Sequence, residues 1–281
     1  APWLDAVMLA ISQLGGEILF MAIVIALFWC MDKRKGYYLM TVGFFGIVAN
    51  QFLKLVFRVS RPWIRDPEFT IVEGARAGAT GYSFPSGHTQ NAAAVLGCPA
   101  RMARKKGLEI TLWVLYALVG ISRMYLGVHT PYDVGVGVVM GLVLVFGLYP
   151  FFSEKNYKPQ RMYVLLGVML ALSIAFTTYT RLYPFPADIE VDNLSHGIKN
   201  GYTLTGAVAG MLAAFWLDEH YVHFQTAGSL PAHIVKCVVG LGLLLGIKTV
   251  LKPPMNALFG GDPIADAFRY AIVVFFAAGV W

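Results

Sequence analysis

Three short polar stretches interrupt an otherwise apolar sequence, and each lies where an apolar run begins or ends. They occupy residues 54–62, 85–88 and 122–133. Together they contain three cationic side chains, two imidazoles, a carboxylate and a Ser-Gly turn. Such a set suits a site that holds a phosphate group while a histidine attacks it.

The cationic side chains match the charge of a phosphate ester, which resists attack because it is anionic. Lys54, Arg61 and Arg123 can supply positive charge around the non-bridging oxygens, and arginine offers two parallel donors to phosphate. Ser86 and Gly87 stand at the expected start of a helix, where backbone N–H groups favour an anion. Arg123 lies inside an apolar run, and a charge in that setting is a functional candidate by default.

The two histidines can divide the work of nucleophile and acid. Asp133 follows His129 by four residues, and Pro131 is expected to begin a helix between them. A carboxylate one turn into that helix could hold one ring nitrogen of His129 and leave the other free to attack. His88 has no acid nearby in the sequence and could protonate the leaving oxygen.

Each of these residues also has a structural explanation when it is taken alone. Thr130, Pro131 and Asp133 fit an N-cap, a proline at the first helical position and an acid at the third. Ser86 could be only an N-cap, and Lys54 could extend its amine from a helix end to the membrane surface. Either histidine alone could be interfacial. Their joint occurrence at one membrane face favours the catalytic interpretation.

The elements that must position these residues are apolar. Of the 281 residues, 57% are hydrophobic and 14% are charged, whereas a soluble domain carries about 25% charged residues. The apolar runs approach the roughly 20 residues that cross a bilayer, and they do not alternate as barrel strands do. We therefore expect an all-α polytopic membrane helix bundle with about nine spans. After a short amphipathic helix at 3–12, they are expected at 15–31, 37–58, from 86 into the basic stretch 101–106, and at 108–127, 131–152, 162–180, 201–217, 233–251 and 267–281. The polar segments 32–36, 62–84 and 181–200 are expected as loops.

The net charge of +6 could indicate either a nucleic-acid partner or the charge distribution of a membrane protein. Membrane topology explains it better, since the cations lie in short segments between apolar runs. Alternation of the spans puts all three polar stretches on one side. Ten Lys and Arg residues fall on the other side, in the clusters 33–35, 101–106 and 155–161, and Lys236 makes the two sides equal in number. Compact basic clusters in short loops stay in the cytoplasm. We therefore expect the site to face the non-cytoplasmic side of a plasma, inner or endoplasmic-reticulum membrane.

Three further features carry weaker expectations. The cysteines lie inside or at the ends of apolar runs without a pairing pattern, so we expect three buried thiols, Cys30, Cys98 and Cys237. The first five residues lack the basic segment of a cleavable signal peptide. Alternating acids at 188, 190 and 192 could bind a divalent cation, although such acids in a loop are usually just solvated.

The three stretches resemble the signature of the type-2 phosphatidic acid phosphatase superfamily of membrane lipid phosphatases, which is related to the soluble vanadium haloperoxidases. The signature reads K-x6-R-P, P-S-G-H and S-R-x5-H-x3-D. Every position is matched, by Lys54, Arg61, Pro62, Pro85, Ser86, Gly87, His88, Ser122, Arg123, His129 and Asp133. The resemblance covers residues from about 37 to 150.

The resemblance implies a role for each matched residue. His129 would form a phosphohistidine, Asp133 would orient it, and His88 would be the general acid. The phosphate would be bound by Lys54, Arg61, Ser86, Gly87 and Arg123, without a metal or other cofactor. The resemblance also implies a six-span phosphatase core, here residues 1–160. About three further spans would lie in 161–281, as in the sphingosine-1-phosphate phosphatase and glucose-6-phosphatase branches.

The sequence therefore predicts a metal-independent hydrolase of a lipid phosphate monoester or diphosphate, such as a sphingoid-base phosphate or a polyprenyl (di)phosphate. A phosphotransferase that passes the phosphoryl group to a lipid or sugar acceptor is an alternative. A non-catalytic phospholipid binder or transporter is another, although it has no need of His88 together with the His129–Asp133 pair. The bilayer and a lipid phosphate are the expected partners, and nothing in the sequence indicates a protein partner.

Overall fold

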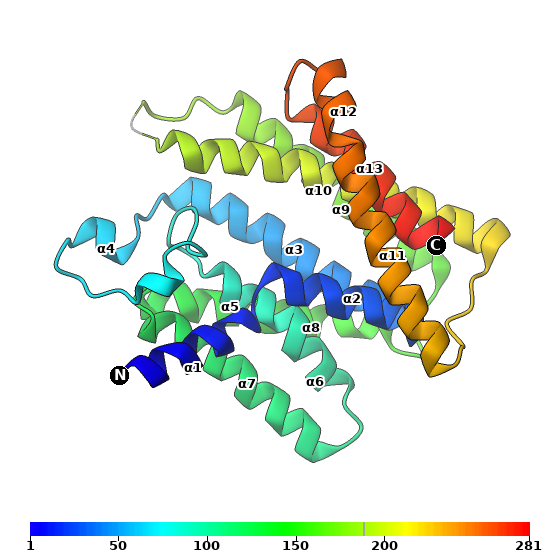
Figure 1. Cartoon of the computed structure of the whole chain (residues 1–281), viewed down its shortest axis with the longest axis horizontal. Helices are drawn as coiled ribbons and strands as arrows, with labels where there is room; N and C mark the ends of the chain where they lie inside the picture. The colour runs from blue at the N-terminus through cyan, green and yellow to red at the C-terminus, as the bar shows by residue number, and fades with distance from the viewer. Residues whose placement is uncertain (188) are drawn as a thin grey trace. The chain divides into compact units, whose positions relative to one another are not determined.

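The computed structural model describes residues 1–187 and 189–281 and contains no β-strand among them. Asp188, which belongs to the expected acidic loop, lies outside the described residues. The chain divides into two compact helical units (Figure 1). The first unit comprises residues 1–25 and 34–156, and the second comprises 26–33 and 157–281.

The first unit contains the three polar stretches. Its helices are α1 (Pro2–Gln13), most of α2 (Glu17–Cys30), α3 (Lys33–Phe57), α4 (Pro62–Arg65), α5 (Gly87–Ala92), α6 (Cys98–Met102), α7 (Lys106–Tyr125) and α8 (Pro131–Phe152). A π-helical segment, Ala93–Gly97, joins α5 to α6 without a break. A single 3-10 turn, Glu73–Ala75, lies in the long connection before α5.

The run from α5 to α6 is the centre of this unit. Its residues 92–96 are fully or almost fully buried, and α5 packs against both α7 and α8. Small residues allow the close approach: a Cβ at Gly141 of α8 would stand 2.6 Å from the Cβ of Ala93. The start of α5 therefore lies next to the end of α7 and the start of α8, where two of the three polar stretches are found.

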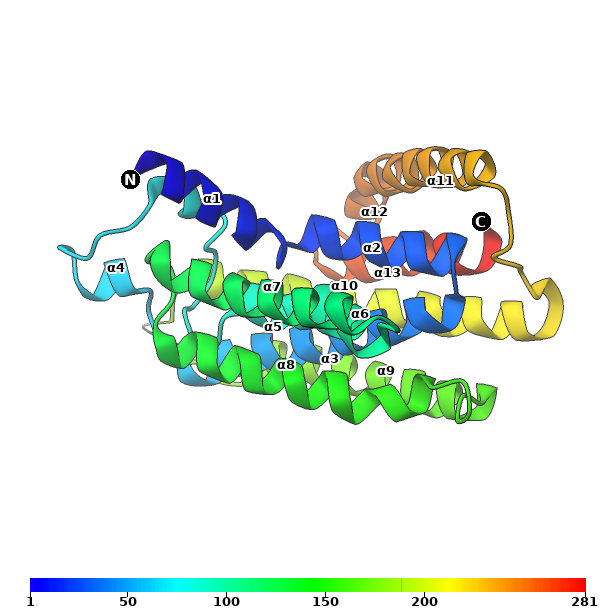
Figure 2. The ribbon, with the colours of Figure 1, turned by 90° about the horizontal axis from the view of Figure 1, so that it is seen from below.

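The N-terminal helix reaches the same region through a bend. Residues 14–16 separate α1 from α2, whose axes differ by 44° (Figure 2). α1 packs along α7, and the side-chain amide of Asn91 donates to the carbonyl of Gly15 at 2.9 Å. A Cβ at Gly15 would collide with the carbonyl oxygen of His88, so only glycine allows this contact.

The second unit is built on close contact between two helices. It contains α9 (Pro159–Leu182), α10 (Val191–Leu217), α11 (Leu230–Val250), α12 (Lys252–Leu258) and α13 (Ile264–Phe275), with π-helical segments at Asp218–Val222 and Phe276–Val280. α10 packs against α9 and, most extensively, against α13 (Figure 1). Gly206 and Gly210 lie directly on the backbone of Ala267 and Ala271. This small-residue spacing is typical of helix pairs in membranes, where close packing replaces hydrophobic burial as the driving force.

The cysteine expectation was partly wrong. Only Cys98 is fully buried, whereas Cys30 and Cys237 are half-buried with their sulfur atoms 3.5 Å apart. No pairing pattern was visible in the sequence because α2 and α11 meet only in the tertiary structure. Near them, the ammonium of Lys33 pairs with the buried carboxylate of Asp218 at 2.5 Å.

Among the residues that the structure describes, five helices are long and apolar enough to cross a membrane, or six if α1 and α2 together make one bent span. The five are α3 with α4, α7, α8, α9, and α11 with α12. The other three expected spans are helical. The run 87–102 is shorter than a bilayer requires, α10 has no stretch that is sufficiently apolar, and the last expected span forms α13 with the π-helical segment Phe276–Val280.

Several expected boundaries were wrong. The basic cluster 33–35 forms the first turn of α3 rather than a loop. α3 begins at Lys33 rather than 37, whereas its end at Phe57 lies one residue from the expected 58, where Arg58 adopts a left-handed φ of 47°. α10 begins at Val191, so half of the expected loop 181–200 is helical. Low hydropathy excludes residues from a lipid span but does not prevent them from continuing a helix. The negative charge of Asp192 in the first turn of α10 interacts favourably with the helix dipole and so stabilises this helix start.

The packing of α10 on α13 generates a stability prediction. Replacing Gly210 by leucine places a side chain against the backbone of Ala271. This overpacking should lower the free energy of unfolding by about 1–3 kcal/mol, and with it the unfolding temperature of the detergent-solubilised protein by several degrees. At Gly242 of α11 no atom lies within 4 Å of the place that a Cβ would occupy, so Gly242→Leu is the matched control and should have little effect. Equal melting temperatures for the two variants would contradict this account of the interface.

Candidate functional site

Hydrogen bonds join the three polar stretches at one end of the first unit. The backbone N–H of Ser86 donates to the carbonyl of Asp133 at 3.0 Å. The side-chain amide of Asn50 donates to the carbonyl of Pro85 at 3.1 Å, and the ammonium of Lys54 donates to the carbonyl of Tyr82. The ends of α3 and α7 and the starts of α5 and α8 therefore surround one cluster.

Asp133 both caps a helix and faces the histidine. Thr130 and Asp133 form a reciprocal capping box at the start of α8, with the N–H of Thr130 donating to Oδ2 at 2.7 Å. The hydroxyl of Ser83 donates to the same oxygen at 2.6 Å. Oδ2 also lies 3.4 Å from Nδ1 of His129, which is an ion-pair distance rather than a short hydrogen bond. The structural and functional explanations of Asp133 are thus compatible.

The ring of His129 is oriented from both sides. Its Nε2 lies 3.0 Å from Nη1 of Arg61. A guanidinium can only donate, so Nε2 must be the accepting nitrogen, and a neutral ring carries its proton on Nδ1 toward Asp133. Burial, reinforced by the nearby cations, lowers the pKa of His129 well below 6.5 and keeps the ring neutral, although Asp133 opposes this effect. The lone pair on Nε2 therefore lies among the cations.

Arg61 is held almost entirely by backbone. Its Nε donates to the carbonyl of Gly81 at 2.9 Å, Nη2 donates to Thr80 at 2.6 Å, and Nη1 donates to Val128 at 2.9 Å. These carbonyls come from the segment just before the second polar stretch and from within the third. Hydrogen bonds of this kind offset the free-energy cost of burying the charge of Arg61.

Arg123 is held differently. Its Nη1 donates to the hydroxyl of Ser12 at 2.6 Å, whereas Nε and Nη2 are buried and make no hydrogen bond within the described part of the chain. Lys54, Arg61, Arg123 and His129 are each at most 7% exposed. A buried guanidinium with one edge unsatisfied is costly, so Arg123 is suited to receive an anion.

His88 belongs to the same cluster and is half-buried at the start of α5. Burial and the positive charges of Arg123, Arg61 and Lys54 lower the pKa of His88 to about 3. A neutral imidazole beside three cations is poised to become protonated when negative charge enters the cluster, because an anion raises the pKa of a neighbouring histidine.

The remaining signature residues are placed as follows. Ser86 is the N-cap of α5 and accepts from the N–H of Thr89, so its structural explanation holds. Gly87 is the first residue of that helix, and Lys54 is buried rather than extended to the surface. The hydroxyl of Ser122 donates to the carbonyl of Val119 at 2.7 Å, within its own helix.

Two contacting residues escaped the sequence analysis. Ser83 lies two residues before Pro85, and its position beside the second polar stretch was the only available signal. Ser12 lies 111 residues before Arg123 and carries no local signal at all. The contact of Asn50 with the carbonyl of Pro85 likewise depends on how α3 packs.

The acidic loop was a candidate metal site that includes Asp188, which lies outside the described residues. Glu190 accepts from the side-chain amide of Asn193 at 2.7 Å, as a residue before a helix often does. Within residues 1–187 and 189–281 no three His, Cys, Asp or Glu side chains gather to hold a metal ion.

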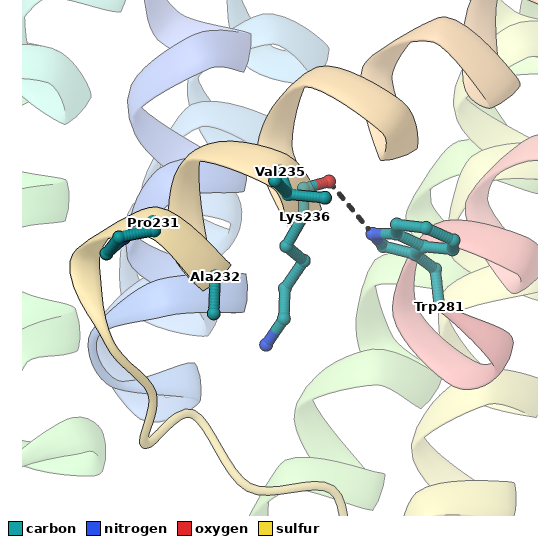
Figure 3. A pocket seen from close by; sticks show the side chains of 5 residues that line it. All are labelled: Pro231, Ala232, Val235, Lys236 and Trp281. Carbon is teal, nitrogen blue, oxygen red and sulfur yellow. Dashed lines mark hydrogen bonds between the residues drawn. The ribbon is translucent and has the colours of Figure 1, made fainter.

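A shallow depression of about 480 Å³ lies in the second unit and contains none of the predicted site residues (Figure 3). It is lined by Pro231, Ala232, Val235, Lys236 and Trp281. The indole N–H of Trp281 donates to the carbonyl of Lys236 at 3.2 Å across it (Figure 3). Its mostly apolar lining does not suit a phosphate group.

Comparison with known proteins agrees with this cluster. Residues 34–157 match the PAP2 superfamily, and residues 202–281 match the PAP2 superfamily phosphatase transmembrane extension. Phosphatidylglycerophosphatase B of Bacillus subtilis is 33% identical over 169 residues, which cover 55% of this chain and 77% of that protein. A dihydrosphingosine 1-phosphate phosphatase of Schizosaccharomyces pombe is 26% identical over 291 residues, covering 95% of this chain and 66% of the relative. Human sphingosine-1-phosphate phosphatase 2 is 23% identical over 85% of this chain and 58% of its own length. No solved structure matches the chain.

The matched regions contain every signature residue and most of the second unit. The spacing of the signature, the convergence of its residues and the similarity to B. subtilis phosphatidylglycerophosphatase B lead to one assignment. The chain belongs to the PAP2 superfamily and is an integral membrane phosphatase.

Proposed function

We propose that this phosphatase hydrolyses a lipid phosphate monoester through a phosphohistidine formed at Nε2 of His129. The contact between Nε2 and Arg61, with Asp133 beside Nδ1, carries the proposal. It supports a nucleophile whose lone pair lies among buried cations. Residues 1–160 form the catalytic core in this proposal, and residues 161–281 add further membrane helices.

The first half of the reaction transfers the phosphoryl group to the protein. Nε2 attacks phosphorus, the N–P bond forms and the P–O bond to the lipid alcohol breaks. His88 gives its proton to the leaving oxygen. Asp133 stabilises the positive charge that develops on the His129 ring, as the third member of a triad does.

The second half releases phosphate. Water attacks phosphorus, the N–P bond breaks, and the neutral His88 takes the proton of the water. The three cations stabilise the charge on the phosphoryl oxygens in both halves. Gly87 offers its backbone N–H at the start of α5, whereas the N–H of Ser86 already donates to the carbonyl of Asp133.

The low pKa of His88 is consistent with a general acid that becomes protonated only when the substrate binds. A phosphate monoester binds in part as a monoanion, which carries a proton into the cluster. The negative charge then raises the pKa of His88 and favours transfer of that proton to its ring.

The substrate class is inferred from the relatives that extend over both units. The sphingoid-phosphate phosphatases of S. pombe and human align with 95% and 85% of this chain, whereas the phosphatidylglycerophosphatase aligns with 55%. We therefore favour a single-chain sphingoid-base phosphate as substrate. An undecaprenyl-diphosphatase of B. subtilis, 28% identical over 53% of the chain, makes a polyprenyl diphosphate the second candidate.

We also propose that the site faces the non-cytoplasmic side of its membrane. The compact basic clusters 33–35, 101–106 and 155–161 lie at the opposite helix ends from the signature residues. Short segments rich in Lys and Arg are retained in the cytoplasm, so these clusters favour a cytoplasmic location for the helix ends that carry them.

Replacing His129 by alanine should lower the rate of phosphate release by about 1,000-fold or more, because the nucleophile is lost. Purified protein in detergent would be assayed with a lipid phosphate in the presence of EDTA, which should leave the wild-type rate unchanged. His220→Ala, which removes an exposed histidine of the second unit, is the control and should retain activity. Acid-quenched wild-type protein should carry radiolabelled phosphate on a histidine, and full activity of His129→Ala would refute the mechanism.

Replacing Asp133 by asparagine separates the two tasks of this side chain. The amide oxygen can still accept from the N–H of Thr130, so the melting temperature should remain close to that of the wild type. The lost negative charge should lower kcat by about 100-fold or more. Asp66→Asn, an exposed aspartate that also accepts a backbone N–H, is the matched control. An unchanged kcat in Asp133→Asn would leave Asp133 with a capping role alone.

A panel of lipid phosphates tests the substrate assignment. We expect kcat/KM to be highest for a sphingoid-base phosphate, lower for undecaprenyl diphosphate and lowest for phosphatidylglycerophosphate. Measurement of released phosphate at matched detergent composition provides the ranking. A preference for phosphatidylglycerophosphate would contradict the assignment while leaving the phosphatase activity intact.

A further inference from the structure

Ser12 connects the N-terminal helix to the candidate phosphate site. It lies in the last turn of α1, outside the residues 34–157 that match the family, and it is only 1% exposed. Its hydroxyl accepts from Nη1 of Arg123 at 2.6 Å. α1 packs along α7, the helix that carries Arg123 in its last turn. The phosphate site therefore has a neighbour that the signature does not contain.

The contact orients the guanidinium of Arg123 in a particular way. Nη1 is occupied by Ser12, whereas Nε and Nη2 are buried and make no hydrogen bond within the described residues. Nε and Nη2 form one edge of the guanidinium, and their two parallel N–H groups match two oxygens of a phosphate. A hydrogen bond at Nη1 thus leaves the bidentate edge available and restricts its rotation.

Contacts at the bend between α1 and α2 fix the position of Ser12 relative to the site. The side-chain amide of Asn91 in α5 donates to the carbonyls of Gly15 at 2.9 Å and of Gly16 at 3.3 Å. Gly15 also packs so closely on the carbonyl of His88 that a Cβ would not fit. The start of α5 and the end of α7 are therefore both attached to residues 12–16.

We propose that Ser12 is a positioning residue that aims the Nε–Nη2 edge of Arg123 at the phosphate of the substrate. This inference rests on the proposed function, in which Arg123 binds that phosphate. Ser12 touches neither the substrate nor the reacting atoms, and it acts only through Arg123. The N-terminal helix is then part of the phosphate site rather than only a membrane-surface element.

The test compares phosphate binding and kinetics in Ser12 variants. Ser12→Ala should raise the Kd for inorganic phosphate about tenfold, because a buried hydrogen bond to a charged group is lost. It should raise KM more than it lowers kcat, since Arg123 binds the phosphate in the ground state as well. Ser12→Thr keeps the hydroxyl and should restore most of the affinity. Ser173→Ala removes a buried hydroxyl of the second unit that bonds Leu170, and it should change neither value.

A double-mutant cycle with Arg123→Ala decides whether Ser12 acts through the guanidinium. Calorimetric titration of inorganic phosphate into the folded protein in detergent should show a tenfold effect of Ser12→Ala in the wild type and none in Arg123→Ala. An unchanged Kd in Ser12→Ala, or the same weakening in both backgrounds, would overturn the proposal. So would an equal loss in Ser12→Ala and Ser12→Thr.

The outcomes separate this inference from the proposed function. If the wild-type protein binds phosphate but releases none from lipid phosphates, the hydrolase mechanism fails, and the Kd comparison still decides the role of Ser12. If the wild-type protein does not bind phosphate at all, both proposals are overturned.

Discussion

The carboxylate of Asp133 joins the two polar stretches on which the candidate site depends. Its Oδ2 accepts from Ser83 before the second stretch and from Thr130 in the third, and it lies beside the ring of His129. The backbone carbonyl of the same residue accepts from Ser86 at the start of α5. One buried residue thus sets both the orientation of His129 and the distance between the starts of α5 and α8. Its negative charge also offsets part of the positive charge in the cluster.

The cluster gathers three buried cations with one buried carboxylate, an arrangement that costs free energy unless each charge is solvated by the protein. Backbone carbonyls solvate Lys54 and Arg61, since the segment 80–82 and Val128 turn their oxygens toward them. Within the described part of the chain, Arg123 receives only the hydroxyl of Ser12. In the proposed function, the remaining excess of positive charge is what would attract a phosphate group to this end of the unit.

The second unit follows a different physical rule. Its closest helix pair, α10 and α13, meets through Gly206 and Gly210 on the backbone of Ala267 and Ala271. Such contact gains dispersion energy where lipid tails would otherwise cover both helices. The unit carries no residue of the signature, and yet its similarity to a phosphatase transmembrane extension shows that it recurs with this kind of core.

The sequence by itself determined the helical membrane class, the family and the identity of the residues that converge, because hydropathy and motif spacing are local properties of the chain. It also placed the helix starts at Ser86 and Pro131, where capping chemistry is local. The sequence placed the starts of α3 and α10 less well, since helix boundaries depend on competition with loop contacts. Only the tertiary structure decided which side chains orient the site. Ser12 and Ser83 reach Arg123 and Asp133 through the packing of helices far apart in the chain, and no local pattern encodes a contact made across 111 residues.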